Sequence, residues 1–353
     1  MSTNSRILVA PLNWGLGHAT RCIPIIRALI SSGYEPIIAS DGIALELLRK
    51  EFPRLKSFEL ATYDITYTKS GKSFKLKLIS KSPKILKAIK KEKKQVKQLV
   101  SEYDIKGIIS DNRLGVRYKN IPSVIITHQL SVLSGDTTWI SSKLHLNYIR
   151  KFDACWVPDV REEPSLSGKL GHLDEYAVPT HYLGILSRFK HQRLPIKTDL
   201  LVILSGPEPQ RSILEERLLE ELRSFKGKVL MVLGKVEPEQ EFFTSCNITV
   251  FNYMTSEELE KALNSSAMVL SRSGYTTILD LAKLRKRAFF IPTPGQYEQE
   301  YLARRLDENG IFPSCDQDDF SVDQLDRVKD YSGFKVLDGH SDIQKLFGLF
   351  EGK

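Results

Sequence analysis

The 353-residue sequence lacks the residue clusters from which disulfides and metal sites are built. Its four cysteines, Cys22, Cys155, Cys246 and Cys315, lie far apart and form no CxxC pair. The seven histidines are also scattered, without an HExxH motif or a Cys/His cluster. This spacing is typical of reduced thiols in a cytoplasmic protein rather than of a disulfide framework or a zinc site. We therefore expect no metal and no cofactor.

Long apolar runs are missing as well. No run approaches the roughly 20 residues of a membrane-spanning helix, and the N-terminal residues lack the layout of a signal peptide. Hydrophobic residues make up 41% and charged residues 27% of the chain, which excludes a largely disordered protein. At about 100–200 residues per domain, the length suggests two domains. These features together predict a soluble, cytoplasmic, two-domain protein.

Acidic residues are almost absent from one segment. Twelve lysines and one acid, Glu92, give Lys69–Lys97 a charge of +11, so the other residues carry −3 of the formal +8. Phe74–Ile79 alternates like a strand or extended arm, and Ser82 and Pro83 then resemble an N-cap and a first helical residue. The following helix has an apolar face and a lysine face. That lysine face is either an ordinary solvated surface or a site for an anionic membrane, possible in a peripheral protein. Nucleic acid is not expected as a partner, because no aromatic residues interleave the lysines.

Short apolar runs rich in Ile and Val alternate with amphipathic helical segments in both halves, a pattern typical of parallel sheets covered on both faces. The runs expected to be strands are Arg6–Ala10, Pro36–Ser40, Gly107–Ser110, Ser123–Thr127, Ala154–Val157, Leu200–Leu204, Lys228–Leu233, Ile248–Phe251, Ala267–Leu270 and Ala288–Ile291. Gly184–Thr198 has the proline and basic residues of a linker. We therefore predict an α/β protein with two doubly wound, Rossmann-like domains, residues 1–187 and 188–335. Residues 336–353 would include a helix that packs back on the first domain.

The loop Pro11–Arg21 (PLNWGLGHATR) follows the first predicted strand, where parallel sheets bind ligands. Gly15 and Gly17 allow the backbone to approach a ligand closely, just before a helix that we expect to begin near Thr20. His18 is either a loop or capping histidine or a general base. Asp111, in SDNR after another strand, is the reserve candidate for the base.

Three loops of the second half suggest a nucleotide site, although neither GxGxxG nor a P-loop motif occurs. Ser205 and Gly206 form either a plain turn or a pair of phosphate donors. In SRSGYTTILD, Asp280 lies one turn into a helix, where its carboxylate suits two ribose hydroxyls. The residues expected to bind the diphosphate there are Ser273, Gly274 and Thr276, and those expected to bind sugar hydroxyls are Glu298 and Gln299.

At these residues the chain resembles the inverting GT-B glycosyltransferases related to glycosyltransferase family 28, and within them a branch carrying GLGHATR. The best-known members transfer N-acetylglucosamine to the peptidoglycan lipid precursor. The resemblance implies two Rossmann-like domains facing across a cleft and a reaction without a metal. It also implies that His18, His128 and Gln129 lie on the acceptor side and that Arg272 contacts the phosphate. Asp280 stands where the family usually has Glu, and Leu302 where it often has Asn.

We therefore expect inverting, metal-independent transfer of a hexose or N-acetylhexosamine from a UDP-sugar. The partners would be the nucleotide-sugar donor and a glycan or lipid-linked acceptor, and His18 would be the base. Two alternatives remain open. One is an enzyme like the UDP-N-acetylglucosamine 2-epimerases, which share the architecture. The other is a protein that binds a polyanion or a membrane surface without catalysis, its nucleotide site being degenerate.

Overall fold

The computed structural model describes residues 5–63, 74–131, 138–206, 208–235, 237–334 and 343–351. The chain divides into two compact units. The first unit contains Met1–Ile65, Lys75–Leu186 and Asp338–Lys353, and the second contains Ser187–Leu337 with Thr66–Phe74. The C-terminal residues therefore belong to the same unit as the N-terminal ones.

The first unit is built on a seven-stranded parallel sheet with the strand order β3-β2-β1-β4-β5-β6-β7. Its strands are β1 (Arg6–Pro11), β2 (Glu35–Ser40), β3 (Ser57–Glu59), β4 (Ile105–Asp111), β5 (Ser123–Ile126), β6 (Ala154–Val157) and β7 (Thr180–Tyr182). The helices are α1 (Gly17–Ser31), α2 (Gly42–Glu51), α3 (Phe74–Tyr103), α4 (Thr138–Ile149), a 3₁₀ turn (Gly168–Leu170) and α9 (Ile343–Leu346) followed by a 3₁₀ turn (Phe347–Phe350). The strand order reverses between β1 and β4, the place where ligands of such sheets bind.

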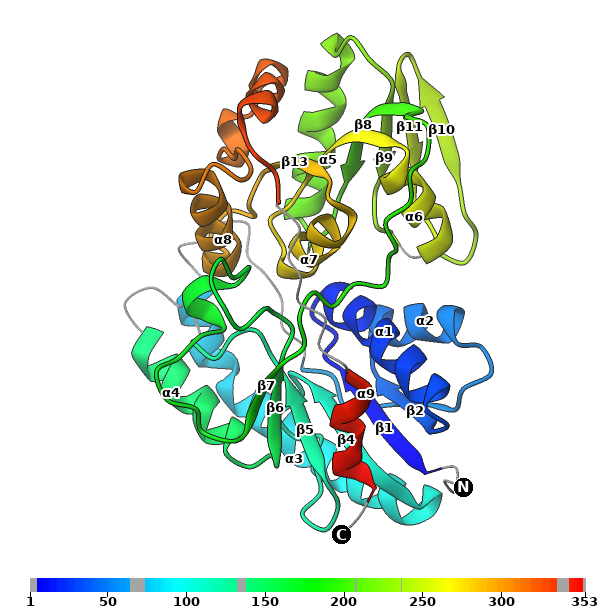
Figure 1. Cartoon of the computed structure of the whole chain (residues 1–353), viewed down its shortest axis with the longest axis vertical. Helices are drawn as coiled ribbons and strands as arrows, with labels where there is room; N and C mark the ends of the chain where they lie inside the picture. The colour runs from blue at the N-terminus through cyan, green and yellow to red at the C-terminus, as the bar shows by residue number, and fades with distance from the viewer. Residues whose placement is uncertain are drawn as a thin grey trace. The chain divides into compact units, whose positions relative to one another are not determined.

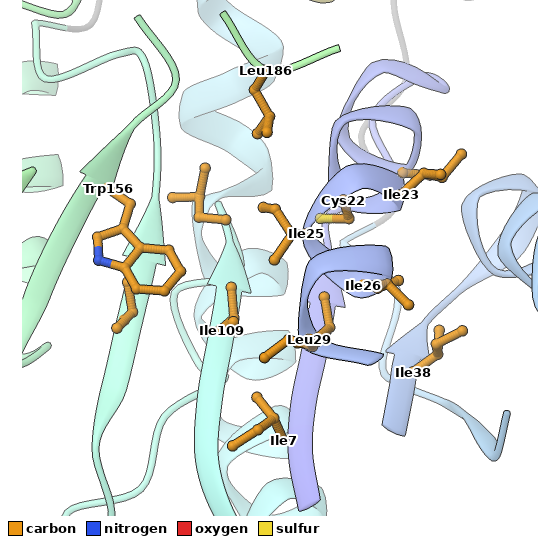
Figure 2. Close-up of a cluster of buried hydrophobic side chains, with 14 of the residues drawn as sticks. Ile7, Cys22, Ile23, Ile25, Ile26, Leu29, Ile38, Ile109, Trp156 and Leu186 are labelled. Atoms are coloured by element: carbon orange, nitrogen blue, oxygen red, sulfur yellow. The ribbon is translucent and has the colours of Figure 1, made fainter. Parts of the chain in front are cut away.

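Helices cover both faces of this sheet (Figure 1), with α1, α2 and α9 on one face and α3 on the other. On the first face Ile25 and Leu29 of α1 pack over Ile7 and Ile109 of the sheet (Figure 2). The C-terminal Phe350 joins this core. Its ring lies against Gly107, where a Cβ atom would come within 2.3 Å of it. A side chain at 107 would thus displace the C-terminal segment.

The second unit has a six-stranded sheet with the order β10-β11-β9-β8-β12-β13, in which only β10 runs antiparallel to its neighbour. Its strands are β8 (Thr198–Ile203), β9 (Val229–Val232), β10 (Phe242–Ser245), β11 (Ile248–Phe251), β12 (Ser266–Ser271) and β13 (Arg287–Phe290). The α-helices are α5 (Gln210–Glu221), α6 (Ser256–Asn264), α7 (Tyr275–Leu284) and α8 (Tyr297–Glu308), and the 3₁₀ turns are Leu222–Ser224, Gln317–Asp319 and Val322–Asp330. Here the strand order reverses between β8 and β12.

The two sheets confirm the predicted doubly wound α/β fold, but two local predictions were wrong. Helix α1 begins at Gly17 rather than near Thr20. Helix α3 begins at Phe74, so Phe74–Ile79 is helical and Ser82 is no N-cap. Lys and Leu are good helix formers, and an alternation of six residues is too short to decide between helix and strand. Among the described helices, none combines the length and the apolar composition needed to cross a bilayer.

A fully buried arginine, Arg113, connects the loops at the carboxyl edge of the first sheet. Its guanidinium donates to Glu92 of α3 and to Asp41 before α2, each at 2.6 Å. It also donates to the carbonyl oxygens of Pro11 at 3.3 Å and Ala61 at 2.6 Å. Burial tends to raise the pKa of Glu92, and the adjacent Arg113 opposes this. One side chain therefore holds the ends of β1 and β2 and the middle of α3 together.

Arg113→Ala should lower the free energy of unfolding by about 3–5 kcal/mol, because it leaves two buried carboxylates without their cation. Arg27→Ala is the matched control, because Arg27 is exposed and its ion pair with Glu51 spans 3.4 Å. That variant should lose no more than about 1 kcal/mol. Urea unfolding followed by circular dichroism measures both. Similar losses for the two variants would contradict the role assigned to Arg113.

Candidate functional site

A buried charge cluster lies where β4 ends and α1 begins, at the switch point of the first sheet. Asp111 is the last residue of β4, and His18 and Arg21 lie one turn apart on α1, so both face the same way. Arg21 grips the carboxylate with two hydrogen bonds: its Nε reaches Oδ2 at 2.5 Å, and its Nη2 bonds Oδ1. The Nδ1 atom of His18 lies 2.8 Å from the same Oδ1. The structure thus brings together the two residues predicted as alternative bases.

The neighbouring charges shift the pKa values of Asp111 and His18, and these shifts decide which of the two can accept a proton. Burial alone would raise the pKa of Asp111, but the charge of Arg21 and hydrogen bonds from Arg21 and His18 hold it well below its usual range. Asp111 is therefore a poor proton acceptor near neutral pH. Burial and the charge of Arg21 lower the pKa of His18, against an opposing effect of Asp111. His18 is neutral near pH 7, and its side chain keeps 13% of its surface exposed.

His128 follows β5 and extends the cluster. Its Nδ1 atom lies 3.1 Å from Nη1 of Arg21, and because the guanidinium is protonated, the arginine donates. The proton of His128 is therefore assigned to Nε2. The next residue, Gln129, contacts Thr127 through its backbone N–H, at 3.0 Å. On α4, burial lowers the pKa of His145 to about 4, and His128 adds to the effect.

The motif GLGHATR indicates that Arg21 lies beside His18, although Arg21 was not among the predicted site residues. His18 and Arg21 are three residues apart in GLGHATR, which puts them on one face of any helix that begins before His18. The expected start near Thr20 hid this relation. Gly15, predicted on the acceptor side, has a φ of +77°, which favours glycine, and Gly17 is the first residue of α1.

Three loops meet at the carboxyl edge of the second sheet, as their positions after neighbouring strands predict. Ser205 and Gly206 follow β8, and Gly206 has a φ of +99°. A Cβ atom on Gly206 would lie 3.7 Å from Oγ1 of Thr293, which follows β13. A Cβ atom on Gly274, which follows β12, would lie 4.0 Å from Nε2 of Gln299 in α8. Two glycine turns therefore border the same loop.

Arg272, which the resemblance places at the phosphate, has both Nη groups bonded to the protein, whereas its buried Nε has no hydrogen-bond partner among the described residues. It is fully buried, and its guanidinium donates to the carbonyl oxygens of Pro292 and Gln210 at 2.9 Å and of Ile291 at 3.2 Å. It also donates to Oε1 of Gln317 at 2.6 Å. Burial lowers the pKa of Arg272 to about 9. The arginine thus joins the loop after β13 to the start of α5.

The other residues predicted to bind the nucleotide-sugar differ in their burial and in whether their side chains already bond the protein. The hydroxyl of Ser273 is buried and donates to the carbonyl of Gln299 at 2.8 Å, so it is already engaged. The Oε1 atom of Gln299 accepts the backbone N–H of Thr293 at 2.8 Å. Thr276 and Glu298 lie in the first turns of α7 and α8, partly buried.

Asp280 lies on the second turn of α7, and its Oδ1 accepts the hydroxyl of Ser187 at 2.5 Å. Burial raises the pKa of Asp280 to about 6, although Arg188 and the Ser187 hydroxyl favour the charged form. The carboxylate therefore has less compensation than Asp111. Across the described residues, no three His, Cys, Asp or Glu side chains gather in a way that could hold a metal ion.

The family model and the relatives that match this chain are all glycosyltransferases. Residues 207–330 match the glycosyltransferase family 28 C-terminal domain. An uncharacterized glycosyltransferase of Methanosarcina acetivorans is 22% identical over 401 aligned positions, covering 99% of each chain. The UDP-N-acetylglucosamine–N-acetylmuramyl-(pentapeptide) pyrophosphoryl-undecaprenol N-acetylglucosamine transferase of Clostridium tetani is 24% identical, over 86% of this chain and 84% of its own. The solved structure of LpCGTa in complex with UDP superimposes with a TM-score of 0.60 at 12% identity, over 99% and 100% of the two chains, which shows a shared fold.

Asp280→Asn should become more stable relative to the wild type as the pH rises. The pKa of Asp280 is raised in the folded state, so the wild type loses stability as the pH climbs from about 4 through about 6, whereas asparagine does not titrate. The relative gain between pH 4 and pH 7 should be up to about 3 kcal/mol. Urea unfolding at a series of pH values measures it. A difference independent of pH would show that Asp280 is not perturbed by burial.

Proposed function

Because the chain is a glycosyltransferase of the family 28 and GT-B type, we propose that it transfers a hexose or N-acetylhexosamine from a UDP-sugar to an acceptor hydroxyl, with inversion. The UDP in the LpCGTa structure and the N-acetylglucosamine named for the Clostridium tetani relative support this choice of donor. The observation that carries the proposal is the pairing of His18 with Asp111 at the switch point of the first sheet.

In the proposed reaction, the acceptor hydroxyl attacks C1 of the sugar, the bond from C1 to the diphosphate oxygen breaks, and UDP leaves. The proton of the hydroxyl passes to Nε2 of His18. Nδ1 of His18 lies 2.8 Å from Oδ1 of Asp111 and 2.7 Å from Nη2 of Arg21. In the proposed tautomer Nδ1 donates to Asp111 while Nη2 of Arg21 bonds the carboxylate, so that Nε2 keeps a lone pair and the imidazolium that forms is stabilised. Asp111, held ionised by Arg21, is thus a positioning residue in the proposal rather than a second base.

On the donor side, negative charge grows on the diphosphate as the bond to C1 breaks. The backbone N–H groups at the start of α7, which follows Gly274, favour such charge without a cation. Asp280 would accept the ribose hydroxyls, and Gln299 and Glu298 would contact the sugar. Ser205 and Gly206 would border the phosphates. Arg272 has no direct contact with the donor in this proposal, because both of its Nη groups bond the protein and the side chain is fully buried.

His18→Ala should release UDP from a UDP-sugar at least about 100-fold more slowly than the wild type, since a positioned base contributes about 10²–10⁴-fold. Its affinity for UDP should not change. His181→Ala is the matched control, because His181 is an exposed histidine on β7 of the same unit. A panel of UDP-hexoses and UDP-N-acetylhexosamines, with water as the acceptor that takes the sugar and UDP release measured by a coupled assay, provides the test.

Two results would contradict the proposal. A His18→Ala protein with the wild-type rate would remove histidine from the mechanism. Conversion of UDP-N-acetylglucosamine to an epimer, with no UDP released, would instead favour a 2-epimerase reaction.

We also propose that the lysine face of α3 contacts an anionic membrane surface, with the acceptor at or near it. The seven lysines between Lys84 and Lys97 are all exposed, whereas Glu92, the one acid of the segment, is buried against Arg113. Leu86, expected on the apolar face, is 48% exposed among them. Burial lowers the pKa of Lys93, and the positive charges of Arg117 and Lys151 add to this, so the basic surface extends beyond α3.

The remaining lysines of the predicted segment add nothing to this argument. Lys69 and Lys72 lie outside the described residues, and the side chains of residues 74–83 are not described.

Replacing Lys87, Lys90, Lys91 and Lys94 by glutamine should abolish most flotation with vesicles rich in anionic phospholipid, because each lysine near such a surface contributes about 1 kcal/mol. Substitution of four exposed lysines of the second unit, Lys190, Lys197, Lys226 and Lys228, is the control with the same change of charge. The control should float like the wild type. Equal loss in both variants would mean that net charge, rather than this surface, attracts the protein.

A further inference from the structure

Thr293 carries a buried hydroxyl that the protein itself does not use. The residue follows β13 and is 1% exposed, and within the described part of the chain its Oγ1 has no hydrogen-bond partner. A buried polar atom left unpaired costs about 1–3 kcal/mol, so native structures keep few of them. A partner supplied by a ligand would explain why threonine, rather than valine, occupies this place.

The hydroxyl borders the turn after β8. A Cβ atom on Gly206 would lie 3.7 Å from Oγ1 of Thr293 and would meet no other described atom within 4 Å apart from its chain neighbours. The φ of +99° at Gly206 keeps side chains away from this position. The space beside the Gly206 backbone is therefore open, with the Thr293 hydroxyl at its border.

A second donor, the amide of Gln299, lies in the first turn of α8, directly after this loop. The backbone N–H of Thr293 holds Oε1 of Gln299, so the amide orientation is fixed, and the Nε2 group lies near Gly274. The loop after β13 and the start of α8 thus present a hydroxyl beside one glycine turn and an amide N–H₂ beside the other. Hydrogen-bond donors next to glycine turns that precede helices α5 and α7 suit anionic oxygens.

We infer that Thr293 is a further donor-binding residue, whose hydroxyl donates a hydrogen bond to a phosphate oxygen of the nucleoside diphosphate beside Gly206. This inference rests on the proposed function, which supplies the nucleotide. It also assigns a phosphate contact in the unit where the guanidinium of Arg272 is committed to carbonyl oxygens.

The test compares Thr293→Val, which removes only the hydroxyl at nearly constant shape, with Thr293→Ser, which keeps it. Calorimetry with UDP should show binding about 10- to 100-fold weaker for the valine variant, the range expected for a hydrogen bond to a charged group. The serine variant should bind UDP within about threefold of the wild type. Uridine, which has no phosphate, should bind all three proteins equally. Without ligand, the valine variant should melt at the wild-type temperature or higher, because an unpaired buried hydroxyl has been removed.

Equal UDP affinity of the wild type and the valine variant would overturn the assignment. A parallel loss of uridine binding would do so too, because the contact would then not be with phosphate. A valine variant that melts earlier without ligand would show that the hydroxyl has a structural partner. A wild-type protein that binds no UDP would instead overturn the proposed function itself.

Discussion

The need to keep one buried carboxylate charged organises the site of the first unit. Asp111 ends β4 without exposure to solvent, and such a charge is tolerated only with a close cation and with hydrogen bonds. Arg21 supplies both through its two bonds to the carboxylate. To do so, α1 must begin early enough for Arg21 to face β4, and this same placement brings His18 to the carboxylate. The position of His18 is therefore a consequence of how the charge of Asp111 is compensated, and the charge of Arg21 adds to burial in lowering the pKa of His18.

Two buried arginines each connect loops at the carboxyl edge of one sheet, but their charges are compensated differently. Arg113 has two carboxylates beside it, which fully compensate its charge and raise its pKa against the effect of burial. Arg272 has neutral acceptors in the described structure, which leaves its charge poorly compensated and lowers its pKa. The planar guanidinium has five N–H donors and can bond several carbonyl oxygens from different loops at once. Arginine is therefore suited to connecting loops in both units. Loops tied in this way hold their glycine turns in place before a ligand arrives.

Much of the fold was predictable from sequence, because strands buried on both faces need continuous apolar runs. The bounds of β6 and β11 agree with the predicted runs. Strands β3 and β7 have only three residues each and β10 is exposed along its length, and none of the three has such a run. The loops of the candidate site were also predictable, since the carboxyl ends of parallel strands lie at one edge of a sheet. The direction in which an arginine side chain points could not be predicted from the sequence. The partners of Arg272 lie 19 to 62 residues away and Asp111 lies 90 residues from Arg21, so these contacts between distant parts of the chain are not indicated by a local pattern.

The pairing of polar groups in the two units bears on where a ligand binds. In the first unit Asp111, Asp41 and Glu92 have arginine partners. Asp159 is held there by backbone N–H groups and Ser167, and among the described residues Asn112, Arg117 and His145 each keep one unpaired buried atom. In the second unit Asp280 has one hydroxyl and a raised pKa, and Thr293 has an unpaired hydroxyl. Groups like these make the free protein less stable than it would be with apolar residues. Ribose hydroxyls would favour the charged form of Asp280, and a phosphate oxygen would satisfy Thr293. Such contacts would recover the lost stability as binding free energy, so the incompletely paired groups Asp280 and Thr293 support the proposed donor site beside the glycine turns.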